Sequence, residues 1–123
     1  MSKSSFHLVR VGIAITFLWI GILIVKQPEA WGGYLRPWAV RLLPVPLEQV
    51  MLGTAIIDII IGALLLVDRL THIAAFAGAL HLTVVLITSG ITDITVRDVG
   101  LLAASLAVMI DSLPKAKVDS KKQ

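Results

Sequence analysis

The chain has 123 residues, of which 57% are hydrophobic and 15% are charged, and its mean hydropathy is +0.91. This composition is too apolar for a soluble domain of that length, and it excludes a disordered chain, a collagen-like chain and a two-domain enzyme. The formal net charge of +3 does not indicate nucleic-acid binding, because most of the surface would have to face lipid. We therefore interpret the chain as an integral membrane protein.

Four stretches approach the roughly 20 apolar residues that a helix needs to cross a bilayer. Their continuous aliphatic runs lack the alternation that is typical of a membrane β-barrel. The sequence therefore predicts an all-α fold, in which residues 1–123 form one domain built on a four-transmembrane-helix bundle. The expected spans run from about Phe6 to Val25, Leu47 to Val67, His72 to Ile91, and Thr95 to Leu113.

The connections between the spans differ in length. The second and third spans are joined through Asp68–Thr71, and the third and fourth through Ser89–Asp93, so these helices should be antiparallel neighbours. The longer segment between the first two spans holds four of the five prolines. We expect it to be an interfacial loop, with a short helix near Tyr34–Leu42. Its expected membrane anchors are Trp31, Tyr34 and Trp38.

The distribution of Lys and Arg predicts the orientation in the membrane. Seven of them lie on the side of the two termini and four on the other side, which favours cytoplasmic termini. The basic tail 114–123, with Lys115–Lys122, is expected to contact solvent or anionic lipid. A cleaved signal peptide is an alternative interpretation of the first span, but Lys26–Ala30 at its exit lacks a small-x-small cleavage pattern.

Asp58 is the most informative polar residue, because a carboxylate in mid-span raises the free energy of insertion by about 2.5–3.5 kcal/mol. Asp58 lies as many residues before the centre of the Asp68–Thr71 turn as His81 lies after it. The two side chains should therefore occur at nearly the same depth in an antiparallel hairpin. Small residues at helical spacing accompany both, and such faces usually turn into a bundle.

Two interpretations of an Asp58–His81 pair remain open. An interhelical hydrogen bond in a membrane contributes only about 0.6 kcal/mol on average, which is less than the free energy of inserting the carboxylate. A role in ligand binding or proton exchange is therefore one hypothesis, and a structural hydrogen bond is the other.

Other charged residues mark the ends of the spans. Arg97 and Asp98 should lie near the outer mouth, beside the aromatic loop, where they either bind a polar group or neutralise each other. Residues Arg10 and Asp111 should lie at the cytoplasmic ends of the first and fourth spans, where we expect a structural ion pair. Two stripes at 3-4 spacing predict packing seams: Arg10, Ala14, Phe17 and Gly21 on the first span, and Arg97, Gly100, Ala104, Ala107 and Asp111 on the fourth.

The sequence also narrows the chemistry. It contains no cysteine, so we expect neither an iron–sulfur cluster nor thiolate catalysis. Heme is not expected, because His81 should be central in depth whereas His7 and His72 should lie near the cytoplasmic boundary. No metal-ligand cluster, phosphate-binding loop or nucleophile elbow occurs. No catalytic residue is assigned, and whether the protein is an enzyme stays open.

Several segments together resemble the DoxX-like family of small four-helix membrane proteins. The first span carries Arg10–Gly12 and Phe17–Gly21, with Lys26 at its exit. The second carries Ile57–Leu66, an acid followed by an apolar run with a glycine, and the fourth opens with Val96–Leu102. The match extends over most of the chain, from Val9 to Ile110. The family usually has glutamate where this chain has Asp58, which is one methylene shorter.

The resemblance implies a multi-pass protein of the cytoplasmic membrane of a prokaryote, and a quinone-facing subunit or one associated with a redox complex. Quinone is then the expected ligand, bound near Asp58, His81, Arg97 and Asp98. The implied partners are membrane lipids and a redox subunit or a second copy of the chain. A small-molecule or lipid-binding module, or one for proton-coupled transport, is the alternative, and a non-catalytic assembly factor is the second alternative.

Overall fold

The computed structural model describes residues 1–114, and the predicted basic tail lies almost wholly outside this range. The described chain is helical, with no strand among these residues, as the sequence predicts. Its six helices are α1 (Lys3–Lys26), α2 (Pro28–Gly32), α3 (Pro37–Arg41), α4 (Leu47–Leu66), α5 (Thr71–Ser89) and α6 (Val96–Asp111).

Three of these helices, α1, α4 and α5, are long and apolar enough to cross a membrane. Many of their large apolar side chains are exposed, among them Leu8, Trp19, Ile56 and Leu80, as expected for surfaces that contact lipid. Helix α6 has 16 residues and therefore rises about 24 Å, less than the roughly 30 Å of bilayer hydrocarbon. The structure thus supports a membrane protein with three candidate spans, one fewer than the sequence predicts.

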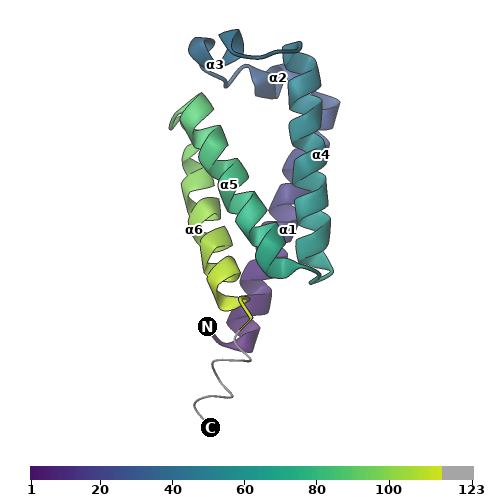
Figure 1. The fold of residues 1–123 in the computed structure, drawn as a ribbon, viewed down its shortest axis with the longest axis vertical. Coiled ribbons are helices and arrows are strands. Elements are labelled where there is room, and N and C mark those ends of the chain that lie inside the picture. Colours follow the sequence, from purple (N-terminus) through teal and green to yellow (C-terminus); the bar gives the residue numbers. More distant parts are fainter. Residues whose placement is uncertain (115–123) are drawn as a thin grey trace.

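The four long helices form two pairs. Helix α1 packs along α4, and α5 packs along α6, as Figure 1 shows. Glycine permits the close approach of the first pair: a Cβ atom at Gly62 would lie 2.9 Å from the carbonyl oxygen of Ala14, and one at Gly21 would lie 3.0 Å from that of Ala55. Buried side chains of all four helices, including Phe17, fill the core between the pairs.

The two pairs are joined at one end by a tight turn between α4 and α5. Two residues of this turn have left-handed backbone conformations, Asp68 with φ 57° and Leu70 with φ 50°. The hydroxyl of Thr71 donates a hydrogen bond of 2.5 Å to Oδ1 of Asp68, which holds the start of α5 against the turn. From this end α4 and α5 diverge toward α2 and α3 (Figure 1). We call the turn end the inner end and the α2–α3 end the outer end.

The segment between α1 and α4 contains two short helices, whereas the sequence predicts one near Tyr34–Leu42. Helix α3 falls within the predicted range, and α2 was not predicted. Each begins with a proline, Pro28 or Pro37, and proline favours the first helical position because it has no N–H to leave unpaired. Apolar contacts of Trp31 and Leu35 with the cluster around Met51 hold this segment to the α1–α4 pair.

Arg36 connects the same segment to the other helix pair. Its backbone N–H donates a hydrogen bond of 2.8 Å to the carbonyl oxygen of Thr88, in the last turn of α5. Its guanidinium packs on Gly90, which ends α5 with φ 71° and ψ −179°. Only glycine adopts this conformation readily, and a Cβ atom there would overlap the guanidinium. Segment α2–α3 therefore bridges the two pairs at the outer end.

Helix α6 packs through a different face from the predicted one. Of the predicted stripe, Gly100 and Ala107 are exposed, and a Cβ atom at Gly100 would meet nothing within 4 Å. The residues that α6 buries are Ser105 and Val108. The prediction of this seam was wrong because small residues mark a close-packed face only where another helix covers it. The stripe predicted on α1 is buried in full.

Candidate functional site

A cavity of about 670 Å³ lies in the outer half of the molecule, between the two helix pairs. We call it the outer cavity. Residues of α1, α4, α5 and the start of α6 line it, together with residues of the α2–α3 segment. Most of the lining is apolar, and the polar side chains are few. This combination is typical of sites for small organic ligands, whose volumes fall between about 300 and 1,000 Å³.

Asp58 and His81 meet at this cavity. Nε2 of His81 lies 3.1 Å from Oδ1 of Asp58, and both residues line the cavity wall. The exposed fraction of the side chain is 5% for Asp58 and 16% for His81. The structure thus brings together two polar residues that the symmetric spacing around the α4–α5 turn placed at one depth.

The faces around this pair explain how the two side chains reach each other. Gly21 of α1 packs directly behind Asp58, because a Cβ atom on Gly21 would lie 3.3 Å from the Cβ of Asp58. On α5, Gly78 lies one turn before His81, and the ring of Phe17 packs against it. Both glycines let neighbouring elements approach closely, and this turns the carboxylate and the imidazole inward.

Arg97 and Asp98 lie at the same cavity, on the first turn of α6. Arg97 is exposed, and its Nε donates a hydrogen bond of 3.3 Å to the carbonyl oxygen of Ile94. Asp98 is half-buried and lies within electrostatic reach of Arg97, Asp58 and His81. All four residues proposed from the sequence therefore line one cavity, with Arg97 nearest to the exposed surface.

Three threonines add hydroxyl groups to the cavity wall. Thr16, Thr54 and Thr88 each donate a hydrogen bond to the backbone carbonyl oxygen four residues earlier, at 2.9, 3.0 and 2.9 Å respectively. A hydroxyl group has one proton to donate and two lone pairs that accept. These three hydroxyls can therefore offer a ligand only their acceptor capacity while the backbone bonds persist.

Two of the three predicted aromatic anchors belong to the cavity. Trp31 and Tyr34 line it, and the centroids of their rings lie 6.0 Å apart. Trp38 is not part of the lining, and 41% of its surface is exposed. Trp19 of α1 lines the cavity and is 66% exposed, so the cavity reaches the outward-facing surface of α1.

Arg10 and Asp111, the residues of the expected ion pair, each have another partner. The guanidinium of buried Arg10 donates hydrogen bonds of 2.5 and 2.9 Å to the carbonyl oxygens of Leu65 and Leu66, and Nε lies 3.8 Å from Oδ1 of Asp68. Those carbonyls end α4, where unpaired oxygens and the helix dipole attract a cation. The sequence pattern did not include them, since backbone groups carry no residue-type signal.

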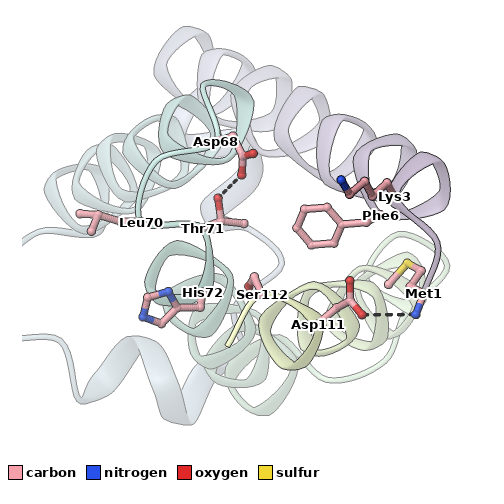
Figure 2. Close-up of a pocket in the computed structure, with 9 residues that line it drawn as sticks. All are labelled: Met1, Lys3, Phe6, Asp68, Leu70, Thr71, His72, Asp111 and Ser112. Carbon is pink, nitrogen blue, oxygen red and sulfur yellow. Dashed lines mark hydrogen bonds and ion pairs between the residues drawn. The ribbon is translucent and has the colours of Figure 1, made fainter. Parts of the chain in front are cut away.

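Asp111 belongs instead to a second pocket, of about 460 Å³, at the inner end (Figure 2). Its Oδ1 lies 3.3 Å from the amino group of Met1. Asp68, hydrogen-bonded to Thr71, lines another side of this pocket, and His72 lies near the edge. Both carboxylates of this pocket, Asp111 and Asp68, therefore already bind groups of the chain itself.

Sequence reasoning missed the threonines and Trp19 as members of the site. Thr54 lies on α4 with Asp58, whereas Thr16 and Trp19 lie on α1, which carries none of the four predicted cavity residues. No charge or spacing distinguishes any of the three from lipid-facing positions. Their role depends on the divergence of α4 from α5, which periodicity does not reveal. No family model, curated protein or solved structure matches this chain.

Proposed function

We propose that this protein binds a lipid-soluble small molecule of the quinone class in the outer cavity, as a membrane subunit associated with a redox complex. The observation that supports the proposal is the opening of the Asp58–His81 pair, with 3.1 Å between Oδ1 and Nε2, into a largely apolar cavity of about 670 Å³. A quinone needs apolar walls for its ring and tail, and a few polar groups for its two oxygens.

The position of the cavity fits access from the lipid. Trp19 is mostly exposed on the outside of α1 and also lines the cavity, and the same holds in part for Ile57 on α4 and Val84 on α5. A ligand dissolved in the bilayer can therefore reach the site sideways, between the helix pairs. Trp31 and Tyr34 close the outer end above it.

The imidazole of His81 supplies the chemistry of the site. It meets the carboxylate of Asp58 through Nε2, so Nδ1 is the nitrogen that can serve a ligand. A carboxylate that holds one imidazole nitrogen fixes the ring orientation and the tautomer, and the pair can pass a proton to or from a ligand oxygen. Asp98 offers a second carboxylate at the same cavity.

The membrane arrangement that goes with this function has four passes, with α6 as a short fourth span and both termini on the cytoplasmic side. Arg10–Gly12, Ile57–Leu66 and Val96–Leu102, the segments that resemble the DoxX-like family, support a redox subunit of a prokaryotic cytoplasmic membrane. A redox protein or a second copy of the chain would supply the electron-transfer groups.

A proton-coupled transporter of small molecules is the second candidate. It is favoured by the presence of two carboxylates, Asp58 and Asp98, at one cavity. A non-catalytic assembly factor is less consistent with the structure, because its polar residues should be mutually satisfied with no cavity beside them. The two remaining candidates differ in what they bind: a transporter should bind water-soluble substrates, and the proposed subunit should retain a quinone from the membrane.

Purification in mild detergent, followed by mass spectrometry of the extracted lipids, tests the proposal. We expect quinone to co-purify with the chain above the level in a detergent-matched membrane-protein control. Asp58→Asn should change the amount retained, whereas Asp111→Asn, an equally conservative change outside the outer cavity, should not. Unchanged quinone retention in a folded Asp58→Asn variant would remove Asp58 from the site, and absence of quinone even after its addition would overturn the proposal.

A further inference from the structure

The polar groups of the outer cavity differ in their hydrogen-bonding capacity, and this difference bears on which redox form is bound. The polar residues that α1 and α4 contribute to the deep wall are Thr16, Thr54 and Asp58. Trp19 of α1 also lines the cavity, but its side chain is mostly exposed. The two threonine hydroxyls donate to Gly12 and Val50 of their own helices. Their lone pairs, like the carboxylate oxygens, accept hydrogen bonds.

The imidazole facing this wall has the same capacity when its ring is neutral. In a neutral histidine one ring nitrogen carries the proton and the other accepts. Because Nε2 of His81 faces Oδ1 of Asp58 at 3.1 Å, the proton of a neutral ring belongs on Nε2, where the carboxylate accepts it. Nδ1 is then an acceptor, and Oδ2 of Asp58 is another.

Groups with N–H or O–H to donate lie toward the outer end or the surface. Arg97 is exposed, Ser89 is the last residue of α5 at the outer end, and Trp31 and Tyr34 belong to the segment that covers that end. The deep part of the cavity is therefore rich in acceptors. A ligand that brings its own protons can satisfy these acceptors, whereas a ligand with carbonyl oxygens alone would leave them unpaired, and an unpaired buried polar group lowers affinity.

We propose that the outer cavity selects the reduced form of its ligand, the hydroquinone, over the quinone. One hydroxyl of the hydroquinone donates to Nδ1 of His81 or to the carboxylate of Asp58, and the other to a threonine hydroxyl or to Asp98. The inference rests on the proposed function, since it names the form of a quinone-class ligand that the same cavity holds. It concerns binding alone and includes no electron transfer.

The test measures binding of three probes that share one ring and one tail. They are decylbenzoquinone, its hydroquinone kept reduced under argon, and the dimethyl ether of that hydroquinone, which has no proton to donate. The full chain is stripped of lipids and reconstituted in nanodiscs, and bound probe is quantified against empty nanodiscs. We expect the hydroquinone to bind roughly tenfold more tightly than the other two, as one extra hydrogen bond to a charged or buried acceptor would give.

The variants separate a site effect from a folding effect. Thr16→Val with Thr54→Val removes two acceptors at nearly constant volume, and should lower the ratio of hydroquinone to quinone affinity several-fold. Thr83→Val is the matched control, because Thr83 makes the same hydrogen bond to its own helix, 2.8 Å to Ala79, but does not line the cavity.

Each outcome is decisive for one of the two proposals. Equal or tighter binding of the quinone, or equal binding of the dimethyl ether, would overturn the selection of the hydroquinone while leaving a quinone-class site in place. Binding of none of the three probes above empty nanodiscs would overturn the proposed function itself.

Discussion

Gly62 of α4 lies directly against the backbone of Ala14 on α1, so closely that a Cβ atom on the glycine would be 2.9 Å from the carbonyl oxygen. This contact fixes the separation of the two helices one turn away from Asp58. The α1–α4 pair is consequently a rigid wall of the outer cavity, against which the α5–α6 pair is placed.

Gly62→Ala should destabilise the protein, because the added methyl group meets backbone that belongs to another helix. Overpacking of this kind lowers the free energy of unfolding by about 1–3 kcal/mol. Gly100→Ala is the matched control: its Cβ atom would meet nothing within 4 Å, and alanine favours a helix over glycine by up to about 1 kcal/mol. Thermal unfolding in detergent measures both variants. A melting temperature of Gly62→Ala equal to that of the wild type would contradict the close contact.

Arg10→Ala should also destabilise the protein, because the carbonyl oxygens of Leu65 and Leu66 would lose a buried cationic donor. The expected loss is about 1.5–3 kcal/mol, the range for hydrogen bonds to charged groups. Arg69→Ala, an exposed arginine beside the same turn, should change stability little. Chemical denaturation measures the free energy of unfolding of both variants. If Arg10→Ala left the free energy of unfolding unchanged, the guanidinium would not stabilise the end of α4.

Gly90→Ala should weaken the link between the α2–α3 segment and α5. Alanine is strained at φ 71° and ψ −179°, by about 1–3 kcal/mol, and its methyl group would displace the guanidinium of Arg36. We expect faster backbone hydrogen exchange at Arg36, whose N–H bonds to Thr88. Gly53→Ala, in open space on α4, should leave that exchange rate unchanged. Unaltered protection of Arg36 in Gly90→Ala would argue against this link.

Asp58 and His81 should show energetic coupling. In a double-mutant cycle with Asp58→Asn and His81→Gln, we expect an interaction energy of roughly 0.6 kcal/mol and at most about 1.7 kcal/mol, as found for interhelical hydrogen bonds in membranes. Unfolding of the wild type, both single variants and the double variant gives this value. A larger coupling would favour a structural role for the pair, and additive effects would mean that the contact does not stabilise the fold.

The sequence was informative where residue type and spacing act through one helix or one tight turn. The apolar runs predicted the helices, and the equal distances of Asp58 and His81 from a four-residue turn predicted their common depth, because an antiparallel hairpin keeps register. The predicted seam on α6 failed since it needed knowledge of which helix covers Gly100 and Ala107. The partner of Arg10 was missed because it is backbone, and backbone groups are present at every position.

The outer cavity itself could not be predicted in this way. It results from the angle between α4 and α5, which depends on the left-handed conformations of Asp68 and Leu70 and on the distant contact of Arg36 with Thr88 and Gly90. Local sequence patterns specify an element and a face, whereas a crossing angle is a property of the whole assembly.

The placement of the α4–α5 turn at the inner end has a mechanical consequence. Helices α4 and α5 meet at this turn and diverge from it. A small backbone rotation at Asp68 and Leu70 therefore becomes a much larger displacement at the outer end, where Arg36 links the two helix pairs. A contact made with another protein at the inner end would thereby be transmitted as a change in the width of the cavity at the opposite end of the molecule.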